Sequence, residues 1–524
     1  MGLRTMFVAI AAAAIAAPVG AQSNKLDTTL QSVTTGSAQV LITTSAGSAP
    51  AVANKLQQHG RAVFKQYALL NLVSANVTSD DLASLTADPT VLSVSSDASI
   101  ASSTDAGGGG SNAPVSQLPA MLGLPVRTLS GKGVGVAVID SGLAPSGDFS
   151  NTSFYDFTSS IPIDPYDDYG HGTHVAGLIA GKGSLSQGAY SGVAPGVRLI
   201  VMKVLDSQGL GQTSDVINAI EFATLNRATL GVDIINLSLG HPILEPAATD
   251  PLVQAVEAAV RAGIVVVVSA GNVGKNIVTG APGYAGILSP GNAPSAITVG
   301  AANTQATISR GDDAVASYSS RGPTWYDALA KPDIIAPGQD LVSDASIGST
   351  LFTTYPTRLV SGNGGIMRFL RLNGTSMSAA NTTGVAALLI EDARASGVNP
   401  SPDTIKQILE YTAVPVAGAD PLTQGHGELD GAGAVALMDA VIATGEAPTD
   451  AAATLPSQTS TVGAETWLWG QTVVWGNTVV WGNTVVWGNT VVWGNSVLVG
   501  ETVVWGNTVV WGNTVVWGNA NDSY

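Results

Sequence analysis

The sequence has 524 residues, of which 45% are hydrophobic and only 11% are charged, whereas about a quarter of the residues in an average soluble domain are charged. This composition excludes a charge-rich disordered protein, and a net charge of −17 argues against nucleic acid as the partner. The chain has no cysteine, which excludes disulfides, thiol nucleophiles and cysteine-ligated zinc. At about 150 residues per domain, the length predicts about three units.

The first 21 residues have the order of an export signal. Arg4 is the only charged residue before an apolar run from Met6 to Ala17. Pro18 ends that run, and the small residues of positions 19–21 suit a signal-peptidase cleavage site. The run is too short to cross a bilayer. We therefore expect a signal peptide over 1–21 and a secreted protein, whether in the medium, at the cell surface or in the periplasm.

Residues 22–101 have the pattern of a small α+β domain. Strands are predicted at 39–42, 69–73 and 90–94, and short helices at 51–59 and 79–85. A run rich in Ser and Gly follows, and its composition predicts a flexible linker over 102–114 that a protease would cut easily.

In residues 115–447, short apolar runs alternate with helical patterns. Runs that are apolar on both faces suit the buried strands of a parallel sheet, and their alternation with helices is typical of an α/β domain. Strands are predicted at 133–139, 199–202, 234–237, 264–268 and 296–299, and helices at 214–227, 251–261, 375–393 and from 401 onward. The predicted fold class is therefore α/β with a mostly parallel central sheet.

The C-terminal residues 465–524, after a linker expected at 448–464, repeat the hexapeptide Thr-Val-Val-Trp-Gly-Asn. Trp recurs at positions 469, 475, 481, 487, 493, 505, 511 and 517, and Val499 fills the one gap. An even period places every Trp on the same side of an extended strand, and high β propensity with almost no charge favours sheet association. We expect a β-prone tail, either a small solenoid or a stacked sheet, that self-associates or attaches the protein to a cell surface.

Two polar motifs mark the ends of predicted strands. Asp140 follows the strand 133–139, at the edge where open α/β sheets bind ligands, although a turn or helix cap would also use an Asp there. Asn272 follows the strand 264–268, and its amide can donate to a developing oxyanion.

Two further motifs begin predicted helices. His171 lies between two glycines and can carry a proton. We expect His174, three residues on, to be a packing residue, because no third zinc ligand lies at a suitable spacing. Ser376 begins the helix 375–393, where it is either a cap or a nucleophile whose oxyanion meets the positive helix end.

Three motifs in this chain order resemble those of the subtilisin-like serine protease (subtilase) family: Asp140-Ser141-Gly142, His171-Gly172-Thr173-His174 and Gly374-Thr375-Ser376-Met377. The resemblance covers residues 115–446 and implies a three-layer subtilisin-like fold and a serine endopeptidase that acts on protein or peptide substrates and requires no cofactor. It implies Ser376 as nucleophile, His171 as general base and Asp140 as the group that orients the imidazole.

The same resemblance assigns the remaining site residues. Asn272 and the backbone N–H of Ser376 would form the oxyanion hole, and Ser238-Leu239-Gly240 would pair with an extended substrate, with one deep pocket selecting the side chain before the cut. Residues 22–101 resemble the family's inhibitory propeptide, which would make the chain a self-processing zymogen. Calcium is common in the family as a structural ion. The candidate oxygen donors for calcium are Asp148, Asp164, Asp167 and Asp168, of which none is assigned as a ligand.

The chain departs from the family in two places. Ser378-Ala379-Ala380 stands where the family usually has a Pro that bends the helix, and the stretch 346–369 reads as an insertion. A second hypothesis is a surface or adhesive protein that acts through its Trp-rich repeat and carries a vestigial protease domain. The presence of all four candidate residues (Asp140, His171, Asn272 and Ser376) argues against that hypothesis, because a scaffold would have no use for them.

Overall fold

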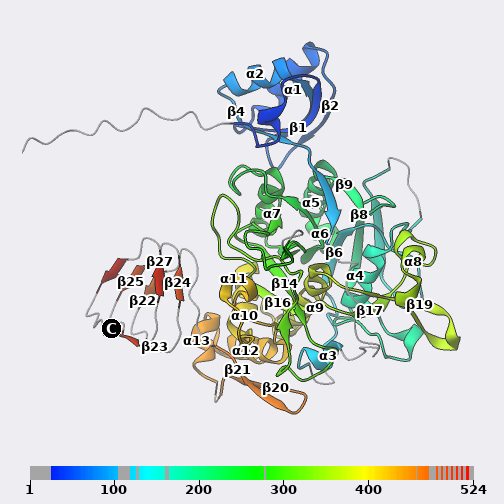
Figure 1. Ribbon diagram of the computed structural model, residues 1–524, viewed down its shortest axis with the longest axis vertical. Coiled ribbons are helices and arrows are strands. Elements are labelled where there is room, and N and C mark those ends of the chain that lie inside the picture. Colours follow the sequence, from blue (N-terminus) through cyan, green and yellow to red (C-terminus); the bar gives the residue numbers. More distant parts are fainter. Residues whose placement is uncertain are drawn as a thin grey trace, which may run out of the picture.

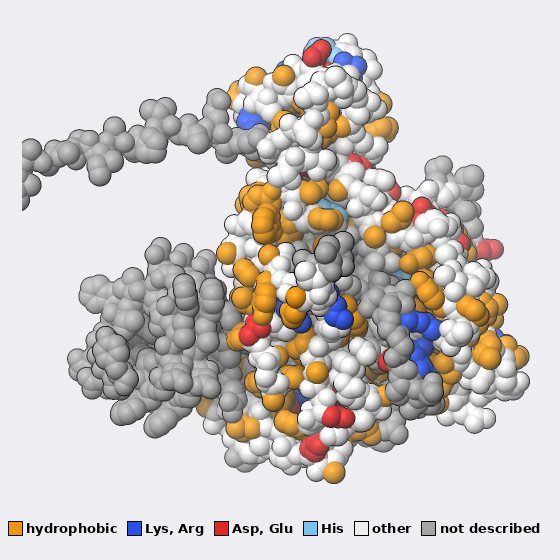
Figure 2. Space-filling model, in the orientation of Figure 1, with side chains coloured by type: hydrophobic (Ala, Val, Ile, Leu, Met, Phe, Trp, Pro, Cys, Tyr) orange, Lys and Arg blue, Asp and Glu red, His pale blue; other side chains and the backbone are white. Residues whose placement is uncertain are grey.

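The computed structural model describes residues 25–103, 118–124, 129–159, 164–275, 279–455 and 457–470, together with the backbone of short strands between 479 and 517. The signal peptide expected at 1–21 and most of the linker expected at 102–114 lie outside these residues. No helix in the described part of the chain is long and apolar enough to cross a membrane. Charged side chains are sparse on the face shown in Figure 2, as the composition predicts.

The first unit is a four-stranded antiparallel sheet in the order β2-β3-β1-β4, covered on one face by two helices (Figure 1). Its elements are β1 (Ser37–Thr44), α1 (Ala49–Gln58), β2 (Val63–Tyr67), β3 (Leu72–Thr78), α2 (Ser79–Ala87) and β4 (Val91–Ser96). Alternate side chains of β1 face opposite ways: Val40 and Ile42 pack under the helices, whereas Leu41 packs against the second unit. The middle of β1 is therefore buried on both faces of the sheet.

The second unit is built on an eight-stranded sheet in the order β15-β14-β12-β10-β6-β8-β7, with β16 also paired to β14. All pairs are parallel except that between β14 and the short edge strand β15. The strands are β6 (Gly135–Asp140), β7 (Thr152–Asp156), β8 (Arg198–Lys203), β10 (Ile234–Leu237), β12 (Val265–Ser269), β14 (Ile297–Asn303), β15 (Ala314–Val315) and β16 (Ile334–Pro337). The predicted α/β class with a mostly parallel sheet is confirmed.

Helices cover both faces of this sheet and give it three layers. The longer helices are α4 (His171–Ala180), α5 (Thr213–Leu225), α7 (Pro251–Arg261), α9 (Thr375–Ala395), α10 (Pro402–Thr412) and α12 (Gly431–Thr444), and the shorter ones α3 (Leu118–Met121), α6 (Arg227–Leu230) and α11 (Pro421–Gln424). Along β10, Ile234 faces the core under α4 and α9, whereas Ile235 faces the core under α5 and α7. Each fully buried side chain of this kind contributes about 1.5–3 kcal/mol.

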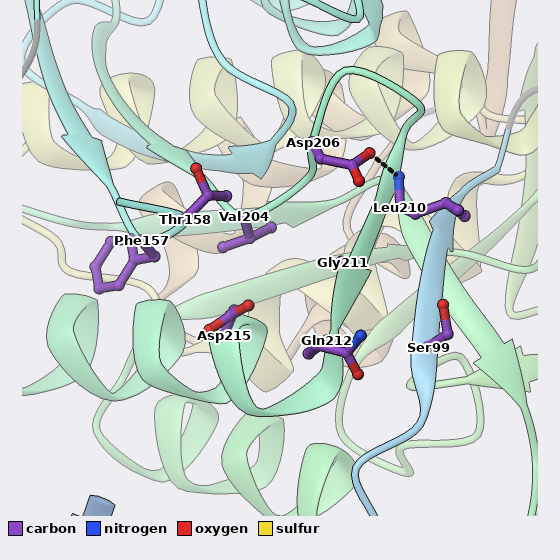
Figure 3. A pocket seen from close by; sticks show the side chains of 9 residues that line it. All are labelled: Ser99, Phe157, Thr158, Val204, Asp206, Leu210, Gly211, Gln212 and Asp215. Atoms are coloured by element: carbon purple, nitrogen blue, oxygen red, sulfur yellow. Dashed lines mark hydrogen bonds between the residues drawn. The ribbon is translucent and has the colours of Figure 1, made fainter. Parts of the chain in front are cut away.

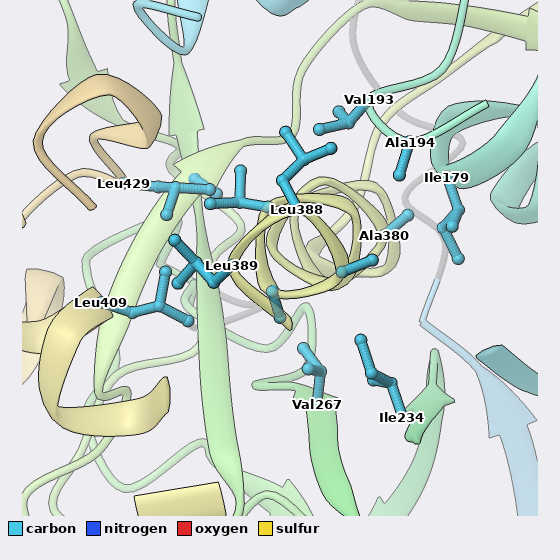
Figure 4. Close-up of a cluster of buried hydrophobic side chains, with 14 of the residues drawn as sticks. Ile179, Val193, Ala194, Ile234, Val267, Ala380, Leu388, Leu389, Leu409 and Leu429 are labelled. Atoms are coloured by element: carbon cyan, nitrogen blue, oxygen red, sulfur yellow. The ribbon is translucent and has the colours of Figure 1, made fainter. Parts of the chain in front are cut away.

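Helix α9 lies at the centre of the molecule. Figure 4 shows Leu388 and Leu389 of α9 surrounded by apolar side chains from the sheet and from neighbouring segments, and nearly every residue of the helix is buried. The helix continues unbroken for 21 residues without the Pro that the family usually has. In this part of the helix Asn381 Nδ2 donates to the carbonyl of Pro337 at 2.8 Å, which fixes the helix to the end of β16.

The stretch 346–369, which reads as an insertion, belongs largely to a small antiparallel sheet. This sheet contains β17 (Leu341–Asp344), β18 (Leu359–Ser361) and β19 (Met367–Leu372), in the order β17-β19-β18, with α8 (Thr350–Thr354) between β17 and β18. Helix α4 packs against β17. The insertion itself contacts the segment just before α4, because Thr350 N donates to the carbonyl of Asp168 and Leu351 N to that of Tyr169, both at 3.0 Å.

Residues 448–470 correct the linker expected at 448–464. They form α13 (Pro448–Ala452) and a hairpin of β20 (Thr459–Val462) and β21 (Glu465–Leu468). Ala451 and Ala452 are fully buried, and the first Trp of the repeat, Trp469, is only 1% exposed against the ring of Tyr411. The low charge and small side chains that made this stretch resemble a linker instead allow close packing against α12.

The strands of the tail pair in parallel with a constant offset. They are β22 (Val479–Trp481), β23 (Val485–Trp487), β24 (Val491–Trp493), β25 (Val497–Val499), β26 (Val503–Trp505), β27 (Val509–Trp511) and β28 (Val515–Trp517). Each strand pairs with the third strand after it, in the rows β22-β25-β28, β23-β26 and β24-β27. Of the two arrangements expected for the tail, this parallel offset of three hexapeptides favours the solenoid.

Candidate active site

The sheet order brings the candidate residues to one edge. Asp140 is the last residue of β6, Ser238 directly follows β10, and Asn272 lies just beyond β12. These strands are neighbours in the order β12-β10-β6, and the carboxyl ends of parallel strands meet at the same edge. His171 and Ser376 lie in the first turns of α4 and α9, which pack against each other.

Asp140 and His171 form a buried pair. A hydrogen bond of 2.7 Å joins His171 Nδ1 to Asp140 Oδ1, and neither side chain is exposed. The start of α4 approaches β6 closely enough that a Cβ on Gly172 would lie 2.3 Å from the carbonyl oxygen of Gly142, so this position requires glycine. His171 Nε2 is buried and has no hydrogen-bond partner in the described part of the chain.

Asp167 organises the segment around His171. Its Oδ1 accepts from the hydroxyl of Ser141 at 2.9 Å and from Gly170 N at 2.7 Å. Its Oδ2 accepts from the backbone N and the hydroxyl of Thr173, at 2.8 and 2.7 Å. A carboxylate that caps the start of α4 in this way also complements the positive end of the helix. Asp167 therefore fixes the residues on both sides of His171.

Ser376 lies beside Asn272 and the carbonyls of two other segments. The Ser376 hydroxyl lies within hydrogen-bond distance of two carbonyl oxygens, that of Ser103 at 2.7 Å and that of Ser238 at 3.1 Å, and its one proton can be donated to either. The backbone N and the hydroxyl of Thr375 both donate to Asn272 Oδ1 at 3.1 Å. Asn272 Nδ2 is buried and has no acceptor among the described residues, so this donor is free for an oxyanion.

Ser238-Leu239-Gly240 lies against a strand of the chain itself. The strand β5 (Ser99–Ser102) is the blue ribbon that runs from the first unit onto the second in Figure 1. It pairs antiparallel with β11 (Leu239–Pro242) on one side and β9 (Leu210–Gln212) on the other. The N–H of Ser103 extends the pairing to the carbonyl of Ser238 at 3.0 Å. The segment before Ser103 therefore occupies the place of an extended peptide.

An open pocket of about 410 Å³ flanks this strand on the outer side of β9 (Figure 3). Its lining includes Ser99 of β5 and the two acidic side chains of Asp206 and Asp215. Burial, with the nearby Asp97 carboxylate, raises the pKa of Asp215 to about 6. Asp206 is partly committed, because its Oδ1 accepts from Leu210 N at 3.0 Å.

The structure also shows the surroundings of His174 and of the other Asp residues considered as calcium donors. Burial lowers the pKa of His174 to about 3, and its neutral ring faces the carbonyls of Leu341 and Leu370 through Nε2, as expected of a packing residue. Asp168 pairs with Lys203 at 2.6 Å. Asp148 is buried and accepts from Leu185 N, whereas Asp164 is exposed. In the described ranges, no group of three or more His, Asp and Glu side chains is placed to hold a metal.

Sequence reasoning missed two residues of the site. Ser103 was placed in a linker because it lies in a Ser- and Gly-rich run, and only its register against β11 shows that its carbonyl meets Ser376. Asp167 was considered only as a calcium donor. Its position four residues before His171 is a signal that could have indicated a helix cap.

Comparisons with known proteins agree with this arrangement. The model of the "Subtilase family" matches residues 131–434. Serine protease AprX from Bacillus subtilis is 39% identical over 313 residues, which are 58% of this chain. The match spans 66% of AprX, just under two thirds of its length. Subtilisin E from the same organism is 35% identical over 354 residues, which are 66% of this chain and 78% of subtilisin E.

A solved structure shares the fold. Fervidolysin from Fervidobacterium pennivorans, described as a keratinolytic enzyme related to subtilisin, aligns with a TM-score of 0.58 and 22% identity over 77% of this chain and 61% of its own. The family model alone matches more than half of the chain. The chain therefore belongs to the subtilase family, whose members are subtilisin-like serine endopeptidases.

Proposed function

We propose that this protein is a secreted serine endopeptidase that hydrolyses peptide bonds through an acyl-enzyme on Ser376. Ser376 is the nucleophile, His171 the general base and Asp140 the group that orients the imidazole. Asn272 Nδ2 and the N–H of Ser376 form the oxyanion hole. The export pattern of residues 1–21 supports secretion.

The chemistry follows from the contacts of these side chains. The Ser376 hydroxyl turns from the two carbonyls that it contacts towards His171 Nε2, which takes its proton as Oγ attacks the carbonyl carbon. The C–N bond breaks when His171 returns the proton to the leaving nitrogen, and water then hydrolyses the ester with His171 again as base. Burial of Asp140 and His171 keeps competing water away from their hydrogen bond.

We also propose that the chain is a self-processing zymogen whose N-terminal unit, expected from the sequence at 22–101, is the inhibitory propeptide and ends at Ser103. The observation that carries both proposals is the 2.7 Å contact between the Ser376 hydroxyl and the Ser103 carbonyl, within a strand paired as a substrate would be. The bond cut in processing is then Ser103–Thr104. Until β5 leaves, it blocks the groove.

Contacts remote from the groove hold the propeptide in place. Lys65 pairs with Glu221 of α5 at 3.3 Å, and the Tyr67 hydroxyl donates to the carbonyl of Ser214 at 3.1 Å. Asp97 Oδ1 accepts from Ser214 N at 2.8 Å and thereby caps the start of α5. These contacts persist after the Ser103–Thr104 bond is cut, so the released unit remains an inhibitor until it dissociates.

Ser376→Ala tests the proposal. We expect the variant to accumulate as uncut precursor and to leave casein intact, because both reactions need the same hydroxyl. Ser361→Ala, an exposed serine on β18, is the matched control and should process normally. The mass of the processed wild-type protein should place its new N-terminus at Thr104. Removal of the propeptide by the purified Ser376→Ala protein would refute the assignment.

A further inference from the structure

The side chain before the cut lies between two segments of the peptidase unit. The Ser103 N–H donates to Ser238 O, at the start of the segment 238–240. On the other side, Ser269 at the end of β12 donates through its hydroxyl to the Ser103 hydroxyl at 3.1 Å. Ser103 is only 5% exposed and Ser269 only 1%. A side chain at position 103 therefore points into the space between segments 238–240 and 269–271.

Each segment contains a glycine next to this space, Gly240 in one and Gly271 in the other. Leu288 occupies the volume that side chains at these two positions would take. A Cβ on Gly271 would lie 2.7 Å from Leu288 Cγ and 2.9 Å from its Cδ1. A Cβ on Gly240 would lie 3.1 Å from Leu288 Cβ. The Leu288 side chain is therefore in contact with both walls.

The backbone holds Leu288 in this position. Leu288 N donates to the carbonyl of Ala270 at 3.1 Å. The strand β13 (Leu288–Ser289) pairs with β11, where Leu288 is opposite Pro242. Leu288 N is bonded to one wall and β13 pairs with the strand that contains the other, so the backbone of Leu288 cannot withdraw without breaking main-chain contacts that also support the substrate strand.

We propose that Leu288 closes the pocket for the residue before the cut and restricts this protease to small side chains there, such as Ser, Ala and Gly. The inference rests on the proposed function and replaces the deep pocket expected from the family resemblance. A substrate with Phe or Leu before the cut would have to displace Leu288 from between the walls. This steric clash disfavours large side chains at that substrate position. Ser269 adds a hydroxyl partner for a substrate Ser.

The test compares kcat/KM of the mature enzyme for four-residue peptides that end in Ala, Ser, Leu or Phe before a chromogenic amide. We expect the wild type to cut the Ala and Ser peptides at least about ten-fold more efficiently than the Phe peptide. Leu288→Gly should raise kcat/KM for the Phe peptide about ten-fold or more and change that for the Ala peptide little. Leu225→Ala, on the exposed end of α5, is the matched control and should leave the ratio unchanged.

A second measurement uses the precursor itself and does not depend on purifying a mature Leu288 variant. Ser103→Phe should slow processing, Ser103→Ala should not, and Leu288→Gly in the same chain should restore processing of Ser103→Phe. Equal cleavage of the Ala and Phe peptides by the wild type, or no restoration by Leu288→Gly, would overturn the role of Leu288 alone. If the wild type cuts none of the peptides, the proposed function falls together with this inference.

Discussion

The Asp167 carboxylate is stabilised by a set of short hydrogen bonds. Four donors from Ser141, Gly170 and Thr173 converge on its two oxygens at 2.7–2.9 Å. Donors to a buried carboxylate form stronger hydrogen bonds than those between neutral groups. His171 is fixed between two of these anchored residues, so its position depends on a side chain that does not touch the substrate.

Asp167→Ala leaves these donors buried without an acceptor. We expect a loss of about 3 kcal/mol or more in the free energy of unfolding and a fall of about 10–100-fold in kcat because His171 shifts. Urea unfolding and steady-state kinetics well below the unfolding midpoint measure the two effects separately. KM should change little, since no substrate contact is lost. The exposed Asp164→Ala is the control, and an unchanged kcat in Asp167→Ala would show that the segment positions itself without this carboxylate.

At the scale of elements, apolar runs were sufficient to predict the centre of the sheet. The strands β6 and β12 lie where runs of five or more apolar or small residues predict them, because burial on both faces favours such runs. The strand β10 also lies where it was predicted, although Asn236 interrupts its apolar run; that side chain is fully buried and donates to Ser238 Oγ at 3.0 Å. The edge strand β7 was missed because its residues are half-exposed and carry no such run. The strand predicted at 69–73 begins later, at Leu72, because residues 68–71 form a turn.

The hairpin β20-β21 ties the end of the chain to the peptidase unit. Trp469 Nε1 lies 3.0 Å from where a Cβ on Gly433 of α12 would be, so the indole packs directly on that helix. Glu465 accepts from Arg310 N at 2.9 Å. The period of six did not distinguish this Trp from the later ones, although Trp467 and Leu468 stand before it where the later hexapeptides have two valines.

Trp469→Ala should therefore destabilise the peptidase unit by about 3–5 kcal/mol. The neighbouring Leu468→Ala, whose side chain is 52% exposed, should cost no more than about 0.5 kcal/mol. Urea titrations in the Ser376→Ala background avoid self-digestion during the measurement. Equal stabilities of the two variants would mean that the hairpin is not part of the cooperative unit.

At the scale of the whole molecule, the contact between the two units contains a titratable group. Glu245 is 8% exposed and lies beside Ser95 and Asp27 of the first unit and Thr249 and Asp250 of the second. Burial, with the carboxylates of Asp250 and Asp27, raises the pKa of Glu245 to about 7. The bound state therefore holds a proton that the separated units release.

This raised pKa sets the sign of a pH dependence. The contribution of Glu245 to propeptide binding is fully present below its ordinary pKa of 4.5 and is lost as the pH rises through about 7. We expect the inhibition constant of an added propeptide to increase about 10–100-fold between pH 5 and 8, and Glu245→Gln to flatten the dependence. Inhibition of peptide cleavage over that range measures it. A wild-type constant that decreases with pH would contradict the sign.

The candidate site residues could be selected from the sequence where the local pattern marks a single residue, and their roles stay proposals. Asp140, His171, Asn272 and Ser376 stand beside glycines or at strand ends, and those positions are visible in the chain. Roles that require two distant segments to meet were not visible. Leu288 sits in the pocket only because β13 pairs with β11, and Ser103 meets Ser376 only through the register of β5.

If a substrate takes the place of β5 between β9 and β11, as we propose, it is held through both edges of its backbone. Such a substrate needs free backbone N–H and C=O groups on both edges. In a helix, or in a strand paired on both sides, these groups are already hydrogen-bonded. We therefore expect cleavage to begin at flexible loops and unfolded segments, and folded proteins to resist it.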